Sequence, residues 1–242
     1  MIVIGLDDTD VEGSPGTNQA ARRIASALPR GFELVAVLRH QLLLDPRIPY
    51  TSGNGAASVL VRGEPGGAGV LVSLVRAKLA KTPAGSDPGF CVGVSVPADV
   101  TAFGRRCQRE VVLQGEAHAL AARHGLHLEG LGGARIGVIG ALAAVGLAAS
   151  GEDGRVVHLP RWPWPDDLSG VQSLDTLRAR GVHEVREHGT DARVTQGRVD
   201  LGKRLRPAYR DGKVVLYVER AAAGAPGAVE DGLPRWRALK LP

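Results

Sequence analysis

The chain has 242 residues, a formal net charge of +5 and a pI of about 9.6. This length is sufficient for one large domain or two modest ones, so stability requires neither disulfides nor a structural metal. The two cysteines, Cys91 and Cys107, lie far apart in the sequence without a Cys-x-x-Cys motif, which excludes a zinc ribbon, a disulfide scaffold and a redox motif.

The hydrophobic periodicity predicts a mixed α/β chain. It begins with a buried strand over 2–6, a turn, and an amphipathic helix over 17–28. Further strands are expected over 33–44, 57–61, 90–96 and 213–219, and further helices over 70–80, 105–124, 135–149 and 171–180. Two prolines within 161–167 predict a domain junction, and the Ala-, Gly- and Pro-rich stretch 221–232 is expected to be mobile.

No segment of the sequence has the pattern of a signal peptide or a membrane span. The longest apolar run, Ile136 to Ala149, is too short to cross a bilayer. A cytoplasmic protein without a membrane partner is therefore expected. The basic balance is compatible with a nucleotide or nucleic-acid partner. Its richest stretch, Arg198 to Arg210, is more simply interpreted as a solvated strand and loop.

Three carboxylates, Asp7, Asp8 and Asp10, follow directly after the first strand. The carboxyl ends of strands are where open α/β sheets bind ligands. Alternation along an extended segment sends Asp8 and Asp10 to one side and Asp7 to the other. Like charges on one face repel unless a proton or a cation relieves them, and hard oxygen ligands favour Mg²⁺. The alternative is structural: Asp10 caps a turn and Asp7 accepts backbone hydrogen bonds.

A glycine-containing turn, Gly13-Ser14-Pro15-Gly16, leads from these carboxylates to Thr17 at the predicted helix start. Exposed amides and the helix dipole favour phosphate at such a position. The turn lacks the Gly-Lys-Ser/Thr of a Walker A loop. Helix capping by Ser14 or Thr17 is an equal alternative to a chemical role.

Two further glycine-rich segments are candidates for backbone contacts. Gly53-Asn54-Gly55 could turn several amides toward a ligand, although Asn-Gly alone is more typical of a hairpin turn. The stretch 132–146 lacks the Gly-x-Gly-x-x-Gly fingerprint, and a packed helix is expected there. Its Gly137 and Gly140 would let that helix lie close to a sheet.

Four segments, in this order, carry a family resemblance: IGLDDTD, DPRIPYTSGNGA, DPGFCV and IGVIGALAAVG. Together they resemble the archaeal tRNA-isoleucine agmatinylcytidine synthetase family, TiaS. The resemblance implies an α/β (α+β) fold in which a kinase-like domain packs with a ferredoxin-like α/β sandwich. It predicts a core over 1–160, a smaller C-terminal α/β subdomain over 161–220 and a flexible tail over 221–242.

The resemblance also implies an activity. The family uses ATP and Mg²⁺ to phosphorylate the C2 carbonyl of a wobble cytidine, after which agmatine displaces the phosphate. Asp7, Asp8 and Asp10 would then bind Mg²⁺ and the ATP phosphates, and Thr17 matches a phosphate-accepting threonine. The residues expected to line the nucleotide site are Thr9, Gly13, Ser14, Gly16, Gly53, Asn54, Gly55 and Arg135.

The sequence departs from the family pattern at three points. Thr17 lies between Gly16 and Asn18, where the family's threonine lies in a Cys-Thr-Thr context. Tyr50-Thr51-Ser52 stands where the family carries basic residues, so Arg39, Arg47 or Arg135 would have to supply positive charge. The family's oligonucleotide-binding barrel and zinc ribbon have no counterpart here, so only weak tRNA binding is expected.

These observations predict an ATP- and Mg²⁺-dependent enzyme that transfers a phosphoryl or adenylyl group to a carbonyl or hydroxyl. The substrate would be nucleoside-like or a small molecule, and amine ligation could follow. The alternative is a non-catalytic nucleotide- or RNA-binding module built on the same core. Whether the protein forms a homodimer is left open.

Overall fold

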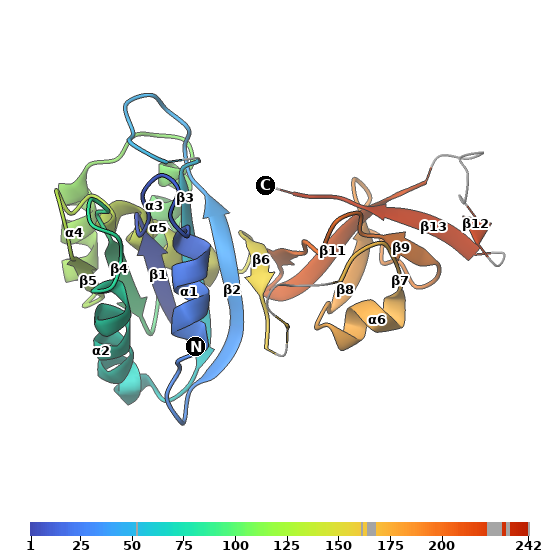
Figure 1. Cartoon of the computed structure of the whole chain (residues 1–242), viewed down its shortest axis with the longest axis horizontal. Coiled ribbons are helices and arrows are strands. Elements are labelled where there is room, and N and C mark those ends of the chain that lie inside the picture. The colour runs from blue at the N-terminus through green and yellow to red at the C-terminus, as the bar shows by residue number, and fades with distance from the viewer. Residues whose placement is uncertain (52, 161, 164–167, 222–228, 231–232, 242) are drawn as a thin grey trace.

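The computed structural model describes residues 1–51, 53–160, 162–163, 168–221, 229–230 and 233–241. Two lobes lie side by side along the long axis of the molecule (Figure 1), the N-terminal lobe over 1–160 and the C-terminal lobe over 168–241. Strand pairing continues from one lobe to the other, because β6 (Arg155–His158) of the first pairs with both β2 (Glu33–Gln41) and β10 (Ala208–Arg210). Among the described residues, no helix is long and apolar enough to cross a membrane.

The N-terminal lobe is a sheet with helices on both faces. Its elements are β1 (Ile2–Asp7), α1 (Thr17–Ala25), β2 (Glu33–Gln41), β3 (Gly55–Arg62), α2 (Ala68–Leu79), β4 (Gly89–Gly93), α3 (Ala98–Cys107), α4 (Gln114–Arg123), β5 (His127–Gly130), α5 (Val138–Ala149) and β6 (Arg155–His158). The strand order is β5-β4-β1-β3-β2-β6, and every neighbouring pair is antiparallel. The ligand-edge rule for open parallel sheets therefore does not apply to β1, because both of its neighbours run in the opposite direction.

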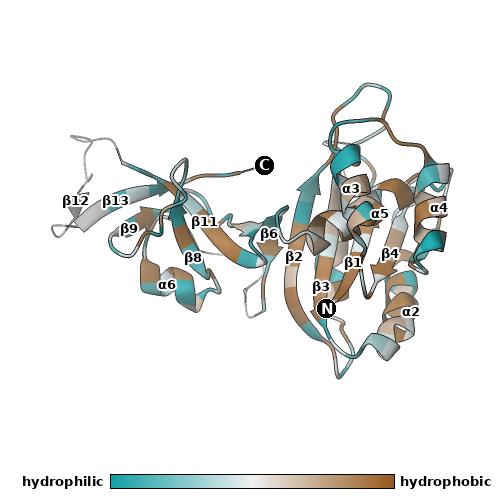
Figure 2. Ribbon diagram, turned by 180° about the vertical axis from the view of Figure 1, so that it is seen from behind, coloured by the Kyte–Doolittle hydropathy of each residue, from teal (hydrophilic) through white to brown (hydrophobic). Residues whose placement is uncertain are grey.

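Strand β1 is buried on both faces, as its apolar run predicts. Ile2, Ile4 and Leu6 belong to the core that includes α1 and α2, whereas Val3 belongs to the core that includes α3 and α5. Figure 2 shows the apolar residues concentrated on the central strands and the helix faces that cover them. A Cβ at Gly5 would lie 2.0 Å from the carbonyl oxygen of Ala141, so α5 packs directly against the β1 backbone.

The predicted helix over 105–124 is wrong as a single element. The chain forms α3, leaves the helix over 108–113 and restarts as α4. The Glu116 side chain accepts a hydrogen bond from the Leu113 amide at 3.1 Å, which marks a new helix start. The adjacent pair Val111-Val112 is a poor helix former and favours the break. Likewise, the predicted helix over 171–180 is strand β7 followed by the short helix α6.

The C-terminal lobe is built around β11. Its elements are β7 (Val171–Ser173), α6 (Leu174–Ala179), β8 (Glu184–Glu187), β9 (Arg198–Asp200), β10 (Ala208–Arg210), β11 (Lys213–Arg220), β12 (Val229–Glu230) and β13 (Leu233–Ala238). Strand β11 pairs antiparallel with β10 and β13 and parallel with β8. This mixed pairing agrees with the expected α/β (α+β) class.

The predicted domain division remains a prediction. The proposed junction falls largely on 161 and 164–167, which lie outside the described residues. Much of the proposed tail, 222–228, 231–232 and 242, lies outside them as well. The rest of that tail includes β12 and β13, and β13 pairs with β11 and with β9.

Candidate active site

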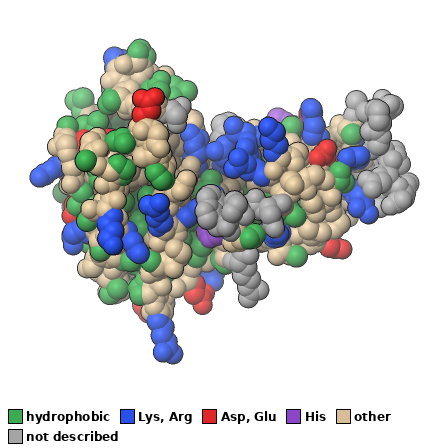
Figure 3. Space-filling view, viewed as in Figure 1, with side chains coloured by type: hydrophobic (Ala, Val, Ile, Leu, Met, Phe, Trp, Pro, Cys, Tyr) green, Lys and Arg blue, Asp and Glu red, His purple; other side chains and the backbone are tan. Residues whose placement is uncertain are grey.

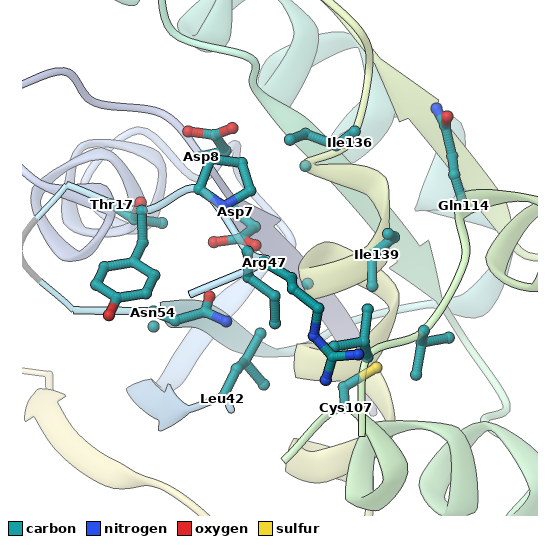
Figure 4. A pocket seen from close by; sticks show the side chains of 18 of the residues that line it. Asp7, Asp8, Thr17, Leu42, Arg47, Asn54, Cys107, Gln114, Ile136 and Ile139 are labelled. Carbon is teal, nitrogen blue, oxygen red and sulfur yellow. The ribbon is translucent and has the colours of Figure 1, made fainter. Parts of the chain in front are cut away.

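A cavity of about 300 Å³ lies at the carboxyl end of β1. Asp7, Asp8, Asp10 and Thr17 line one side of it, and residues 47–51, 53–55 and 110–114 line the others. The first residues of α5 and the two residues before it complete the wall with Ile136, Gly137, Ile139 and Gly140. Figure 4 shows Asp7 and Asp8 on one side and Ile136 and Ile139 on another. The cavity therefore has an acidic side and an apolar side.

All three carboxylates line the same cavity, which differs from the alternation expected of a strand. Strand β1 ends at Asp7, and Asp8 adopts a left-handed backbone conformation with φ of 52°. Alternation holds only for extended residues, so the turn at Asp8 removes the expected separation. A non-glycine residue in this region is strained, and here it gathers charges that a regular strand would keep apart.

Asp7 sits over a gap that a glycine provides in α5. A Cβ at Gly140 would lie 1.8 Å from an Asp7 carboxylate oxygen, so only glycine leaves room for this side chain. Burial raises the pKa of Asp7 to about 7. A backbone hydrogen bond from Asp8 lowers this pKa in part, whereas the charges of Asp8 and Asp10 raise it further. The carboxyl of Asp7 is thus poised to change protonation near neutral pH.

Asp8 is perturbed for related reasons. Burial and the charges of Asp87 and Asp10 raise the pKa of Asp8 to about 6. Asp87 is itself buried and accepts hydrogen bonds from the amides of Arg135 at 2.8 Å and Ile136 at 3.1 Å. Its own amide donates to the Asp8 carbonyl at 3.1 Å. Asp87 therefore ties the segment before α5 to the turn that carries Asp8.

Thr17 opens α1 with its hydroxyl inside a hydrogen-bonded chain. It donates to Asp10 Oδ1 at 3.0 Å and accepts from Thr9 Oγ1 at 3.2 Å. Thr51 donates to the other oxygen of Asp10 at 3.1 Å. Thr9 is 1% exposed and does not line the cavity, so it supports Thr17 from behind.

The Gly53-Asn54-Gly55 segment stands where the connection from β2 ends and β3 begins at Gly55, and it is not a two-residue hairpin turn. All three residues line the cavity. The Asn54 side chain donates to the Leu43 carbonyl at 2.7 Å, and the Asn54 carbonyl accepts from the Leu42 amide at 2.9 Å. These bonds fix the loop against the end of β2.

Four other predicted nucleotide-site residues do not line the cavity: Gly13, Ser14, Gly16 and Arg135. The Ser14 hydroxyl bonds to the amide and carbonyl of Val11 at 2.8 Å each, so it closes the turn. Gly13 takes the positive φ of 78° that this turn needs. Gly16 is the N-cap residue of α1. Arg135 is exposed and packs on Gly130.

Arg47 is the cation that reaches this cavity among the three predicted to supply charge. It forms a bidentate pair with Asp45, with Nε–Oδ1 and Nη2–Oδ2 distances of 2.8 Å. Hydrogen bonds from Arg47 lower the pKa of Asp45 to about 2. Arg39 instead rests against Gly55 from outside, since a Cβ there would lie 2.7 Å from its Nη2 atom.

The apolar wall formed by Val111, Val112 and Leu113, with Cys107 beneath it, was not predicted. The predicted continuous helix over 105–124 left no loop at these residues. The sequence feature that indicates the helix break is Glu116, which stands three residues after Leu113 as in a capping box. Burial raises the pKa of the Cys107 thiol to about 12, so it is no nucleophile at neutral pH. Leu113 is 69% exposed, which places an apolar rim at the cavity mouth.

The carboxylate oxygens of Asp7, Asp8 and Asp10 suit a hard cation that is also coordinated by the phosphates of a bound nucleotide. No group of three His, Cys, Asp or Glu side chains converges as a metal site within the described part of the chain. Asp7, Asp8 and Asp10 therefore do not form a complete three-carboxylate cage. One or two carboxylates with nucleotide phosphates and water are a usual Mg²⁺ arrangement. The raised pKa values of Asp7 and Asp8 are the electrostatic cost that a cation would relieve.

A Ser58–His40–Asp153 chain lies away from the cavity. His40 Nδ1 is 2.6 Å from Asp153 and His40 Nε2 is 2.9 Å from the Ser58 hydroxyl. Both His40 and Ser58 have 0% exposure, so no substrate reaches the hydroxyl. Burial works to raise the pKa of Asp153, but hydrogen bonds from His40 and Gln108 outweigh it and lower that pKa. This chain fastens β2 and β3 to the loop before β6.

No protein-family model and no curated protein matches the sequence. The structure, in contrast, is similar to solved structures. A TiaS–tRNA(Ile2)–ATP complex matches with a TM-score of 0.52 and 26% identity over 60% of this chain and 36% of that one. The chain has a TiaS-like fold.

Two other structures match in the same way. A tRNA fluorescent labeling enzyme matches with a TM-score of 0.53 and 26% identity. A TiaS–tRNA(Ile2)–AMPCPP–agmatine complex matches with a TM-score of 0.51 and 25% identity. Each match covers 60% of this chain and 35% of the other, so the chain spans about a third of the length of these two solved chains. The fold is thus shared with proteins whose solved structures contain tRNA together with ATP, or with AMPCPP and agmatine.

Proposed function

We propose that the chain is an ATP- and Mg²⁺-dependent enzyme that transfers a phosphoryl or adenylyl group to a carbonyl or hydroxyl of a nucleoside-like or small-molecule substrate. The observation that carries this proposal is the Thr17 hydroxyl. It lies at the start of α1, donates to Asp10 at 3.0 Å, and shares a cavity with Asp7 and Asp8. The likeness to a TiaS complex that contains ATP supports it.

Thr17 and Asp10 have the arrangement of a nucleophile and its base. When Thr17 Oγ1 attacks the terminal phosphorus of ATP, a Thr17 O–P bond forms and the bond from that phosphorus to the bridging oxygen breaks. The hydroxyl proton passes to Asp10 Oδ1, and ADP leaves. The N-terminus of α1 stabilises negative charge at this position. Thr51, bound to the other Asp10 oxygen, keeps the carboxylate in place.

Asp7, Asp8 and Asp10 are the residues that would hold Mg²⁺. The ion, when bound, would neutralise phosphate charge, which is most of what phosphoryl transfer requires of a protein. Arg47 also lines the cavity, where its guanidinium is paired with Asp45. The apolar wall at 111–113 and Ile136 provides a dry surface for a flat, weakly polar group such as a nucleobase.

The test is to incubate the protein with ATP and Mg²⁺ and analyse both the protein and the nucleotide. Phosphothreonine at Thr17 with release of ADP is expected, and both should vanish in Thr17→Val, which keeps the side-chain shape. Asp10→Asn should slow the reaction by about 10²–10⁴-fold, as expected for loss of a general base. Release of AMP instead of ADP would indicate adenylyl transfer.

The matched control for this test is Ser14→Ala. Ser14 is a neighbouring hydroxyl that bonds only within its turn and does not line the cavity. Phosphate on Ser14 in place of Thr17 would overturn the assignment. ATP binding without any turnover or modification would favour the non-catalytic nucleotide- or RNA-binding module.

A further inference from the structure

Asp87 is a buried acid that stands behind the active-site cavity. It is 9% exposed and does not line the cavity. It shortly precedes β4, whose first residue, Gly89, pairs with Asp7 at the end of β1. The Asp87 amide donates to the Asp8 carbonyl at 3.1 Å. The Asp87 backbone therefore extends the contact between β1 and β4 into the left-handed turn at Asp8.

Two backbone amides hold the Asp87 carboxylate. The Arg135 amide donates to Oδ1 at 2.8 Å and the Ile136 amide donates to Oδ2 at 3.1 Å. A Cβ at Gly133 would lie 3.1 Å from Asp87 Cγ, so this segment wraps closely around the carboxylate. Within the described ranges, no Lys, Arg or His side chain forms an ion pair with Asp87. Because both of its oxygens accept amide hydrogen bonds, the carboxylate is fixed outside the cavity.

The segment that holds this carboxylate leads directly into α5. A Cβ at Gly137 would lie 2.4 Å from the Asp87 carbonyl oxygen and 3.2 Å from the Asp7 carbonyl oxygen. Gly140, one turn further along, leaves room for the Asp7 side chain. The start of α5 therefore packs on the backbone of both acids. The hydrogen bonds of Asp87 thus fix α5 relative to Asp7 and to the turn that carries Asp8.

Asp87 also adds negative charge beside Asp8. Burial is the largest cause of the raised pKa of Asp8, and the charge of Asp87 is the next. Arg47 lines the cavity but is paired with Asp45. On the face shown in Figure 3, Lys and Arg side chains gather in the saddle between the two lobes. A fixed anion behind Asp8 strengthens the attraction for a cation that binds in front of it.

We propose that Asp87 is a positioning residue for cation binding at Asp8. Its amide and carboxylate clamp the left-handed turn against the start of α5, and its charge raises the affinity for the cation. Groups that orient metal ligands from behind typically contribute about 10–100-fold to metal affinity. This proposal rests on the proposed function, because the cation at Asp7, Asp8 and Asp10 is assigned there.

The experiment titrates the protein with Mn²⁺ in the absence of nucleotide and measures free Mn²⁺ by electron paramagnetic resonance. Asp87→Asn keeps the shape of the side chain and removes its charge, whereas Asp87→Ala removes the carboxylate hydrogen bonds as well. The affinity for Mn²⁺ should fall about tenfold in Asp87→Asn and by up to about a hundredfold in Asp87→Ala.

The matched control is Asp153→Asn. Asp153 is an acid of the same lobe that is hydrogen-bonded to His40 and Gln108 and lies away from the cavity. This variant should unfold at a lower urea concentration than wild type, as the Asp87 variants should, but it should keep the wild-type affinity for Mn²⁺. A role of Asp87 in folding alone would lower the affinity for Mn²⁺ equally in all three variants.

Three results would overturn the proposal: no Mn²⁺ binding by wild type, wild-type affinity in Asp87→Ala, and an equal loss of affinity in Asp153→Asn. Calorimetric titration of the wild-type chain with ATP and Mg²⁺ separates this proposal from the proposed function. Mn²⁺ binding that depends on Asp87, without ATP binding, would refute the proposed function alone. Magnesium-dependent ATP binding, with Mn²⁺ affinity that does not depend on Asp87, would refute the positioning role alone.

Discussion

Replacing Asp7 by asparagine should stabilise the protein at neutral and alkaline pH. A rise in the pKa of Asp7 from 3.8 to about 7 corresponds to about 4 kcal/mol, at about 1.36 kcal/mol for each pKa unit. Because the folded pKa lies above the unfolded one, the folded state holds the proton more tightly. Stability from this group is therefore complete below pH about 4 and is lost as the pH rises toward about 7.

The assay is urea denaturation of wild type and Asp7→Asn in metal-free buffer at pH 5 and pH 8. The free energy of unfolding of the variant, relative to that of wild type, should be about 2–3 kcal/mol higher at pH 8 than at pH 5. Most of the proton loss from folded Asp7 falls between these two pH values. Glu12→Gln, an exposed acid on the adjacent turn, should show no such change. An equal difference between Asp7→Asn and wild type at both pH values would refute a buried, strained carboxylate at this position.

Three further predictions follow from the packing. Gly140→Ala should displace Asp7, destabilise the fold by about 1–3 kcal/mol and weaken ATP binding measured by calorimetry, whereas Gly69→Ala, with nothing within 4 Å of the new Cβ, should not. His40→Ala should cost about 3 kcal/mol or more in chemical denaturation, because it removes a buried side chain, leaves the Ser58 hydroxyl unpaired and takes one of two hydrogen bonds from Asp153; a cost below about 1 kcal/mol would contradict this. Cys91 and Cys107 should resist a thiol reagent until the protein unfolds, because burial raises both pKa values to about 12; rapid labelling of the native protein would contradict this.

Elements with strong periodicity were predictable from the sequence. The run Ile2 to Leu6 and the helix starting at Thr17 lie where the pattern predicts them. The close approach of α5 was predictable from Gly137 and Gly140, because only glycine permits it. Strands β8, β9 and β10 were not predictable, because they are only three or four residues long and contain too few alternating apolar and polar residues to indicate a strand.

The site was predictable in its residue types but not in its geometry. The cluster Asp7, Asp8 and Asp10 was evident, but its gathering into one cavity depends on the left-handed turn at Asp8, which alternation cannot anticipate. The apolar wall at 111–113 depends on a helix break that tertiary packing completes. Ser14 was a plausible phosphate ligand by spacing, yet its hydroxyl bonds to Val11 within the turn.

Similarly, the positive charge between the two lobes could not be located from the sequence. The basic stretch from Arg198 to Arg210 was visible, with a solvated loop as its simplest interpretation. Arg39 and Arg155 are 116 positions apart in the sequence, and the β2–β6 pairing alone brings them together. Long-range strand pairing of this kind leaves no local signal in composition or periodicity.

The nucleotide site is tested most directly by calorimetric titration of the wild-type chain with ATP, with and without Mg²⁺, beside Asp8→Ala and the exposed-acid control Glu12→Gln. Asp8 lines the cavity, whereas Glu12 does not. Wild type and Glu12→Gln should bind ATP in a magnesium-dependent manner, and Asp8→Ala should not bind it. Equal binding by wild type and Asp8→Ala, or no binding by wild type, would contradict the assignment of the Asp7, Asp8 and Asp10 cavity as a nucleotide site.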